Sequence, residues 1–510
     1  MTKCNGFIYT VREGDTIVSI ARMHHIKIAE LIVANSHIDN PTKLSPGQEV
    51  CIPRSESMSQ GNGKPHGSGM LQGKGIKQVV DPEFGVQLPA GYRIKKYVED
   101  LTFPTGIAFN DVGEMYVVES GYRAGCVSGP ARVLRVYPDG STAEITRGFL
   151  PPVTGITWYD ESLYVSESGY PGQITRVFPD GTRETVINNL PTGGDHQLSE
   201  VAFGPDGRMY FGIGTATNSG VAGPDNTWLG KRPRFHDLPC RNYELTERSF
   251  TSENVLKPEI GDTMDTGAWQ PFGVPAKPGQ VVKPQSPCTG VIYQANPDGS
   301  GMRVFADGVR NPFGLGFSPG GSLFATDNGM DVRGSRPVAN AWDTFEEINF
   351  GEWYGWPDYN ARVPVTDPRF KPEDGPQPQF LIRNQPPLAE GPAALFEPHS
   401  VPTKFDFSTG TEFGYRGEAF VALFGHIDHM GDPLPEPTGF KVVRVNIEKG
   451  DVNDFIIILD PRDAGNGPVH PIQARFCPCT GKLYVVDFGQ TGDTGGPPKC
   501  KSGAIWEISR

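Results

Sequence analysis

A recurring pattern of paired apolar strands constrains the fold of this chain more than any other feature. Each unit has an apolar strand, a tight turn that is often Pro-Asp-Gly, and a second apolar strand that ends in a small or acidic residue. Six such units are found, at Thr105–Glu119, Gly155–Glu167, Val201–Gly212, Leu315–Thr326, Thr403–Ala422 and Ile472–Asp487. Third strands follow several of them, at Arg132–Val136, Ile174–Val177, Lys441–Val445 and Ala504–Ile508. Repeated four-stranded antiparallel sheets predict an all-β, six-bladed propeller over residues 81–510.

The composition agrees with this prediction and excludes several classes of protein. The chain of 510 residues holds 64 Gly and 48 Pro, and so many turn formers indicate short strands joined by many loops. Its net charge of −13 argues against a nucleic-acid binder, because neutralising phosphates needs an excess of cationic side chains. No segment approaches the roughly 20 apolar residues of a membrane span. The stretch Met1–Thr10 lacks the pattern of a secretory signal.

The first 54 residues form a separate unit with a different pattern. Phe7–Val11 alternates like a short strand, and Ile17–Met23 reads as a helix that Asp15 or Thr16 can cap. A second helix is expected over Ile28–Asn35 and a closing strand over Glu49–Pro53. The segment 55–80 is rich in Gly and Ser and is predicted to be a flexible linker.

This β-α-α-β unit carries Tyr-Thr-Val-x-x-Gly-Asp-Thr and Leu-x-Pro-Gly-Gln-x-Val-x-Ile-Pro, and it resembles a LysM domain over its whole length. The resemblance implies binding of peptidoglycan, chitin or another N-acetylglucosamine-containing glycan. It places the ligand between the loop Gly14, Asp15 and Thr16 and the loop from Asn35 to Ile38. The alternative is a LysM fold kept for packing or assembly, with weak glycan affinity. Cys4 and Cys51 flank strands that are neighbours in this fold, so a disulfide is expected.

Unusual polar residues gather at one end of the predicted ring. Residues just before the first strand or just after the second strand of each unit share one face, and there the sequence places His196, Arg310, Asn311, Asn328, His399, His426, His470 and Asp487. A single histidine in such a position is more often structural than catalytic. Polar groups from four successive units that converge on one mouth favour a functional site.

The strings that carry this face resemble the glucose/sorbosone dehydrogenase family. They are Gly-Gly-Asp-His-Gln197, Gly308-Val-Arg-Asn-Pro-Phe-Gly, Thr326-Asp-Asn-Gly329 and Tyr354-Gly-Trp-Pro357, and the match runs from about Leu88 to Arg510. The family consists of quinoproteins that bind pyrroloquinoline quinone (PQQ) and calcium on a six-bladed propeller. The resemblance implies that His196 is the general base for a sugar hydroxyl and that Arg310 stabilises the reduced cofactor. It further implies that calcium is bound by the backbone carbonyls of Gly329 and Met330. The other cofactor contacts that it implies are Gln197, Asn311, Asn328, His399, His426 and His470.

The sequence also departs from this family. The acidic partner of the base is replaced by the stretch 214–218, and proline after the calcium glycine is replaced by Met330. Histidines stand where the family holds the cofactor's carboxylates with lysine and arginine, and histidines are weaker, pH-dependent anion ligands. The segment 221–288 is a large insertion that is expected to border the mouth.

The cysteines indicate disulfides across the propeller. Cys126 and Cys500 follow the second strand of the first and last units, so a bridge between them would close the ring. Cys240 and Cys288 bracket part of the insertion and are a second candidate pair. Cys477 and Cys479 occupy a turn on the opposite face, where a metal site, a plain turn or an intermolecular bridge are the alternatives. Placed pairs favour an extracellular, cell-envelope or spore-surface protein.

Three functions remain open from the sequence. The first is a PQQ- and calcium-dependent aldose or sorbosone dehydrogenase that LysM attaches to a glycan-containing surface. The second is a cofactor-free propeller that serves as a binding or structural component of a cell envelope or spore. The third is a calcium-dependent lactonase, which would need carboxylate side chains around the metal.

Overall fold

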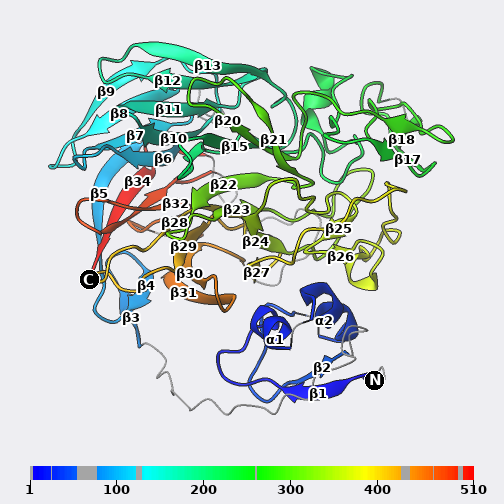
Figure 1. Ribbon diagram of the computed structural model, residues 1–510. Coiled ribbons are helices and arrows are strands. Elements are labelled where there is room, and N and C mark those ends of the chain that lie inside the picture. Colours follow the sequence, from blue (N-terminus) through cyan, green and yellow to red (C-terminus); the bar gives the residue numbers. More distant parts are fainter. Residues whose placement is uncertain are drawn as a thin grey trace.

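The computed structural model describes residues 4–510 except residues 25, 39, 54–76, 122–128, 259–260, 427–436, 463–464 and 492–497. The chain is mostly β-structure with few helices, in a propeller-like arrangement of sheets (Figure 1). Among the described residues, no helix is long and apolar enough to cross a membrane.

The N-terminal unit has the expected β-α-α-β order. Strand β1 (Phe7–Thr10) pairs antiparallel with β2 (Glu49–Ile52), and α1 (Ile17–Met23) and α2 (Ile28–Ala34) lie between them in the sequence. Thr16 caps α1, because its side chain accepts a hydrogen bond from the Ser19 amide at 3.0 Å while the Ser19 hydroxyl accepts one from the Thr16 amide. The predicted Cys4–Cys51 disulfide is confirmed.

Four separate sheets of four antiparallel strands make up most of the ring. The first is β6 (Pro104–Phe109), β7 (Met115–Glu119), β8 (Arg132–Val136) and β9 (Thr142–Arg147). The second is β10 (Val153–Tyr159), β11 (Ser162–Glu167), β12 (Gly172–Val177) and β13 (Arg183–Leu190). The third is β14 (Ala202–Phe203), β15 (Met209–Ile213), β20 (Val291–Ala295) and β21 (Arg303–Asp307). The fourth is β22 (Pro312–Phe317), β23 (Leu323–Asp327), β24 (Asp343–Ile348) and β27 (Ala394–Phe396).

The remaining strands of the ring belong to one ten-stranded sheet. Its order is β3 (Gln78–Asp81), β4 (Val86–Pro89), β31 (Asp451–Ile458), β30 (Lys441–Asn446), β29 (Ala419–Leu423), β28 (Pro402–Phe407), β32 (Pro471–Phe476), β33 (Leu483–Asp487), β34 (Gly503–Ser509) and β5 (Arg93–Leu101). β28 and β32 meet only through a parallel pairing of Lys404 with Gln473. The pairing of β34 with β5, which directly precedes the first of the four separate sheets, closes the ring. β3 begins at Gln78, within the segment expected to be linker, whereas residues 55–76 of that segment lie outside the described part.

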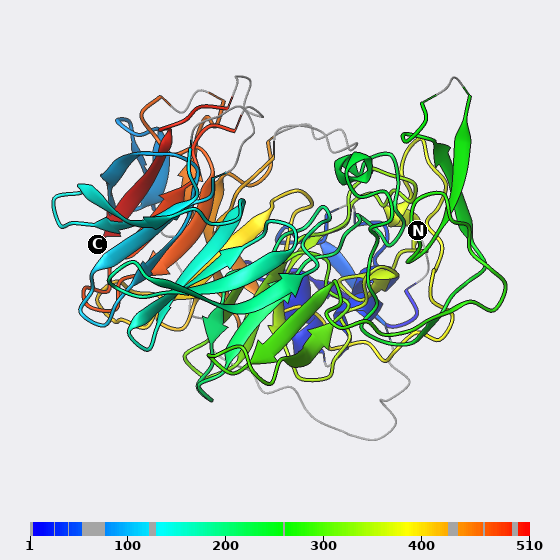
Figure 2. The same cartoon turned by 90° about the horizontal axis from the view of Figure 1, so that it is seen from above.

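A long segment between β15 and β20 carries its own short elements. These are the 3₁₀ helix η1 (Thr227–Gly230) and the strands β16 (Tyr243–Glu244), β17 (Ser249–Glu253), β18 (Thr263–Gly267) and β19 (Val281–Val282). Because β15 pairs directly with β20, residues 214–290 are inserted between neighbouring strands of one sheet. The β17–β18 hairpin projects from the ring on the side away from the C-terminus (Figure 2). A second irregular segment, after β24, contains β25 (Tyr359–Asn360), β26 (Val363–Pro364) and η2 (Pro368–Phe370).

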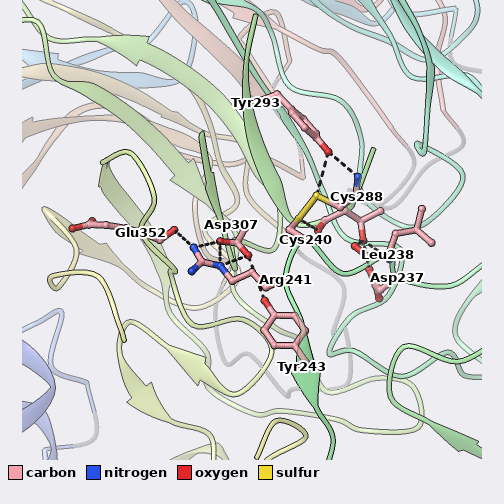
Figure 3. Close-up of a disulfide and its surroundings, with 10 residues drawn as sticks. Asp237, Leu238, Cys240, Arg241, Tyr243, Cys288, Tyr293, Asp307 and Glu352 are labelled. Atoms are coloured by element: carbon pink, nitrogen blue, oxygen red, sulfur yellow. Dashed lines mark hydrogen bonds and ion pairs between the residues drawn. A yellow bond between two sulfur atoms is a disulfide. The ribbon is translucent and has the colours of Figure 1, made fainter. Parts of the chain in front are cut away.

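The insertion is anchored at its base by covalent and ionic contacts (Figure 3). The predicted Cys240–Cys288 disulfide is confirmed, and the Cys288 amide donates to the Tyr293 hydroxyl of β20 at 2.7 Å. Arg241 forms an ion pair with the buried Asp307 at 2.6 Å. Cys500 forms a disulfide, but Cys126 lies outside the described residues, so its pairing with Cys500 stays a prediction. Cys477 and Cys479 are free thiols.

The N-terminal unit packs against the ring through its helices, beside β26, β27 and the β30–β31 turn (Figure 1). Arg22 of α1 donates to the carbonyls of Ile447 and Glu448 at 2.8 and 2.7 Å. Val18, one turn earlier on α1, lies so close to Gly450 that a Cβ there would be 2.4 Å from its side chain. On the other side, Lys43 forms an ion pair with Glu397. The helices therefore bury one face against the ring.

Candidate functional site

A cavity of about 250 Å³ lies where the expected site residues converge. It is lined by the starts of β6, β10, β22, β28 and β32 and by residues around them: Thr105, Ser120, Pro152, Val153, Thr154, Gln197, Asn311, Phe313, Asn328, Val401, Thr403, Phe424, Ile472 and Phe488. Of the predicted residues, Gln197, Asn311 and Asn328 line this cavity together. Since each inner strand starts at the same end of its sheet, the cavity marks one mouth of the central channel.

Two buried amide oxygens point to a ligand in this cavity. Asn311 donates to the Asn328 side-chain oxygen at 2.7 Å, and Asn328 donates to the Pro402 carbonyl at 2.9 Å. Gln197 Oε1 and Asn311 Oδ1 are buried without a hydrogen-bond partner. Unpaired buried acceptors are costly, so these oxygens call for a hydroxyl donor or a cation.

His196 is held as a neutral base beside Gln197. Its Nδ1 lies 2.9 Å from the Thr215 carbonyl oxygen. A nitrogen that faces a carbonyl has to donate, so the proton is on Nδ1 and the basic nitrogen is Nε2. Burial, followed by the charges of Arg310 and Arg333, holds the pKa of His196 well below its usual range. Thr215 belongs to the stretch 214–218. It therefore orients the imidazole through a neutral group and places no negative charge beside it.

Arg310 is buried and tied to its surroundings. Its guanidinium donates to Asp331 at 2.7 Å, to the backbone and side-chain oxygens of Asn218, and to the Asn328 carbonyl at 3.3 Å. Burial raises the pKa of Asp331, but Arg310 and Arg333 outweigh this effect and keep the pKa below its usual range. Arg310, which the resemblance places beside a quinone, is thus already paired with the carboxylate of Asp331.

Arg333 connects the insertion to the site and was not foreseen from the sequence. It contacts Asp195 at 2.6 Å, Asp225 at 2.7 Å and Asp331 at 3.1 Å. Asp195 directly precedes His196, and Asp225 belongs to the inserted segment. Burial raises the pKa of Asp225 to about 6. The only sequence signal for this role is the position of Arg333 shortly after Asn328-Gly329, the residues that follow β23.

The proposed calcium ligands lie at a second, much smaller cavity of about 20 Å³. Gly329 and Met330 line it together with Arg310 and Asn328. The Gly329 amide donates to the buried Asp343 carboxylate at 2.7 Å, which fixes the backbone here. Over the described parts of the chain, no group of three or more His, Cys, Asp or Glu side chains could hold a metal. A cation at this point would be offered backbone and amide oxygens, and the carboxylates of Asp327 and Glu346 line the same cavity; calcium accepts oxygen ligands of all these kinds.

The three predicted histidines of the later units have different contacts, and two of them touch residues of the site. His399 Nδ1 is 3.6 Å from Asp331, and its backbone is left-handed with φ of 64°. His470 stacks on the cavity residue Phe424 with ring centres 4.2 Å apart, and its Nδ1 lies 3.0 Å from the Phe424 carbonyl oxygen. His426 forms an isolated bridge with Thr438. His470 therefore supports the cavity wall, and His399 joins the cluster around Asp331.

Charged side chains meet in the channel next to the cavity. Glu200 accepts from Gln473 at 3.1 Å and from Arg475 at 3.0 Å. Lys404, which is fully buried, donates to the Thr105 carbonyl. Burial lowers the pKa of Lys404 to about 8, against the opposing charge of Glu200. Arg475, which the sequence placed inside a strand, is therefore part of an internal ion cluster.

The predicted glycan-binding residues of the N-terminal unit fall into two groups. Gly14, with φ of 82°, is exposed, and Asp15 and Thr16 after it are half-buried; Asp15 accepts from the Tyr9 hydroxyl at 2.6 Å. Asn35 is buried and bonds both the amide and the carbonyl of Cys51 at 2.7 Å. Ile38 is buried as well. Asn35 and Ile38 thus hold α2 against β2, while the loop from Gly14 to Thr16 stays at the surface.

Comparisons with known proteins agree with the two-part organisation. The LysM domain model matches residues 9–53. No curated protein matches the sequence. The holo form of the pyranose dehydrogenase PQQ domain from Coprinopsis cinerea is similar over 84% of this chain and 98% of its own, with a TM-score of 0.52 and 16% identity. The calcium structure of carbohydrate-active enzyme family AA12 from Trichoderma reesei is similar over 86% of this chain and 98% of its own, with a TM-score of 0.51 and 15% identity. The chain therefore carries a LysM domain followed by a region whose fold is similar to that of PQQ-dependent sugar dehydrogenases.

Proposed function

We propose that this protein is a PQQ- and calcium-dependent sugar dehydrogenase that its LysM domain attaches to a glycan-containing surface. The observation that carries the proposal is the cavity in which Gln197 and Asn311 present unpaired buried oxygens. His196 supplies a neutral base next to this cavity, which suits removal of a proton from a sugar hydroxyl by its Nε2. The similar fold of the Coprinopsis PQQ domain supports the choice of cofactor.

Residues at the two cavities support the choice of an aromatic cofactor and of calcium. The aromatic side chains of Phe313, Phe424 and Phe488 make the cavity suitable for a flat heterocycle. At the smaller cavity, the backbone carbonyls of Gly329 and Met330 would offer oxygen donors of the kind that calcium prefers. When bound, the quinone would accept a hydride and the calcium would polarise its carbonyl. The quinone carbonyls would have to share Arg310 with Asp331.

The architecture of the propeller is part of the same proposal. We count six blades by dividing the ten-stranded sheet at its single parallel pairing, Lys404 with Gln473. One half then has β28–β31 extended by β4 and β3, and the other has β32–β34 closed by β5. With the four separate sheets, this division restores the repeat of the sequence. LysM and the disulfides support an extracellular or envelope location.

Cofactor binding is tested by titrating the full-length protein with PQQ in the presence of calcium and recording absorption. We expect a saturable spectral shift that Gln197→Ala and Asn311→Ala weaken by about tenfold or more, a loss of roughly 1.4 kcal/mol. Asn188→Ala, which removes an exposed amide on β13, is the matched control and should bind as the wild type does. Absence of any shift in the wild type would refute the cofactor.

One observation favours a second function, a cofactor-free propeller that binds a ligand at an envelope or spore surface. Arg310 and Arg333, the cations next to the cavity, are already neutralised by Asp331, Asp195 and Asp225. If the titration shows no shift while the full-length protein is retained on peptidoglycan or chitin, this second function is the one supported.

A further inference from the structure

A cleft of about 490 Å³ lies at the end of the strands opposite to the candidate active site. Its lining residues are Asn110, Asp111, Val112, Trp158, Asp160, Glu161, Ser162, Arg176, Phe178 and Pro179. Thr105 and Thr154, near the starts of β6 and β10, line the channel mouth, whereas Asn110 and Trp158 lie at or just beyond the ends of these strands. At about 3.3 Å per residue, Thr154 and Trp158 are roughly 13 Å apart, so the cleft is a separate site.

Three turns from two adjacent sheets build the cleft. They follow β6, join β10 to β11, and follow β12, and these strands lie side by side (Figure 1). The turn between β10 and β11 has Asp160 and Glu161 in the left-handed region, with φ of 47° and 57°. Two-residue turns of this type favour Asn, Asp and Gly, so the carboxylate of Glu161 stands here against the local preference.

The cleft contains a buried polar atom without a partner. Ser162 is 1% exposed and lines the cleft, and its hydroxyl is buried with no hydrogen bond. Arg176 Nε is buried and unpaired in the same way. Desolvated groups of this kind are normally satisfied, so they point to a bound group that is able to hydrogen-bond.

An aromatic platform is fixed next to these polar groups. The Trp158 ring stacks on Tyr116 with ring centres 5.8 Å apart and planes at 7°. Its indole N–H donates to Asp111 at 3.3 Å. Both contacts hold the half-buried ring in one orientation, and an aromatic face next to carboxylates accommodates the C–H face and the hydroxyls of a sugar.

The charges of the cleft disfavour an anionic ligand. Asp111, Asp160 and Glu161 disfavour an anion. The Arg176 guanidinium lies 4.9 Å over the Phe178 ring, and so already occupies the position that a ligand cation would take on this ring. We propose that this cleft is a second carbohydrate site that binds a neutral saccharide through Trp158, Ser162 and the two turn carboxylates. The proposal is independent of the function assigned to the channel mouth.

The test uses the full-length chain with Asp15→Ala and Gln197→Ala, which weaken the LysM loop and the channel-mouth cavity. This background protein is screened on an array of neutral oligosaccharides, and each saccharide bound is titrated by calorimetry. We expect at least one saccharide to bind, with Trp158→Ala lowering its affinity about tenfold or more. Because Trp158 packs on Tyr116, Glu161→Gln in the exposed turn is the second variant and should weaken binding several-fold without changing the melting temperature.

Glu184→Gln, an exposed carboxylate on β13, is the matched control and should bind like the background protein. An array without any bound neutral saccharide would overturn the proposal. It would also be overturned if Trp158→Ala and Glu161→Gln bound every saccharide with the affinity of the control.

Discussion

At the scale of single residues, contacts between loops fix the side chains at the channel mouth. Gln197, Asn311 and Asn328 were predicted to meet and do line one cavity. The bonds of His196 to Thr215 and of Arg310 to Asp331 were not predictable, because they join loops that no periodic pattern places. Partner choice among loops depends on tertiary packing, whereas strand ends follow directly from the repeat.

The environment of His196 predicts how kcat falls at acid pH, the acid limb of the pH profile. A base has to be unprotonated, and burial together with Arg310 and Arg333 lowers the pKa of His196. If the protein oxidises sugars, kcat should therefore stay constant as the pH falls through 6.5 and decline only well below it. Arg333→Gln removes one cation, so the pKa rises and the limb moves to higher pH.

The measurement is the pH profile of sugar-dependent dye reduction for both proteins. Arg416→Gln, an exposed arginine remote from His196, is the matched control and should leave the profile unchanged. A wild-type limb at or above pH 6.5, or an unmoved limb in Arg333→Gln, would show that His196 does not act as this base.

At the scale of elements, the regular segments and the presence of an insertion were predictable, but the short strands within the insertion were not. The helix Ile17–Met23 has its predicted bounds, and the third strand Arg132–Val136 does as well. In the insertion, β16 and β19 have two residues each, too short for any periodicity. The Cys240–Cys288 pair was nevertheless predicted, since two cysteines bracketed the segment.

Removal of this disulfide should destabilise the protein measurably. Cys240→Ser with Cys288→Ser opens a loop with a sequence separation of 48 residues. We expect a loss of roughly 2–4 kcal/mol in the free energy of unfolding, because the unfolded chain regains loop entropy. The measurement is denaturant unfolding, with Cys479→Ser, an exposed free thiol, as the control. Equal stability of the two proteins would mean that the ion pair of Arg241 with Asp307 anchors the insertion alone.

At the scale of the whole molecule, the sequence predicted the order of the two domains but not how they pack. The sequence predicted a flexible linker over residues 55–80 and said nothing of contacts between the LysM domain and the ring. The described structure has Arg22, Val18 and Lys43 in contact with the ring. Contacts of this kind leave no periodic signal, because they occur once and join residues hundreds of positions apart.

Docking of the LysM domain can be tested with a pair of valines. Val18→Asp places a charge in the interface next to Gly450, whereas Val33→Asp changes an exposed valine on α2. We expect Val18→Asp to separate the two parts and raise the radius of gyration in small-angle X-ray scattering, with Val33→Asp unchanged. The same radius of gyration in both variants would show that this interface does not hold the domains together.

Sugar oxidation at the channel mouth is tested most directly by dye reduction with the full-length protein. The wild type is supplied with PQQ and calcium and offered aldoses, sorbosone and oligosaccharides. We expect sugar-dependent reduction that disappears when either PQQ or calcium is omitted, and a kcat that falls roughly 10²–10⁴-fold in His196→Ala. No reduction with any sugar, or the same rate in His196→Ala as in the wild type, would show that this mouth does not oxidise sugars with His196 as the base.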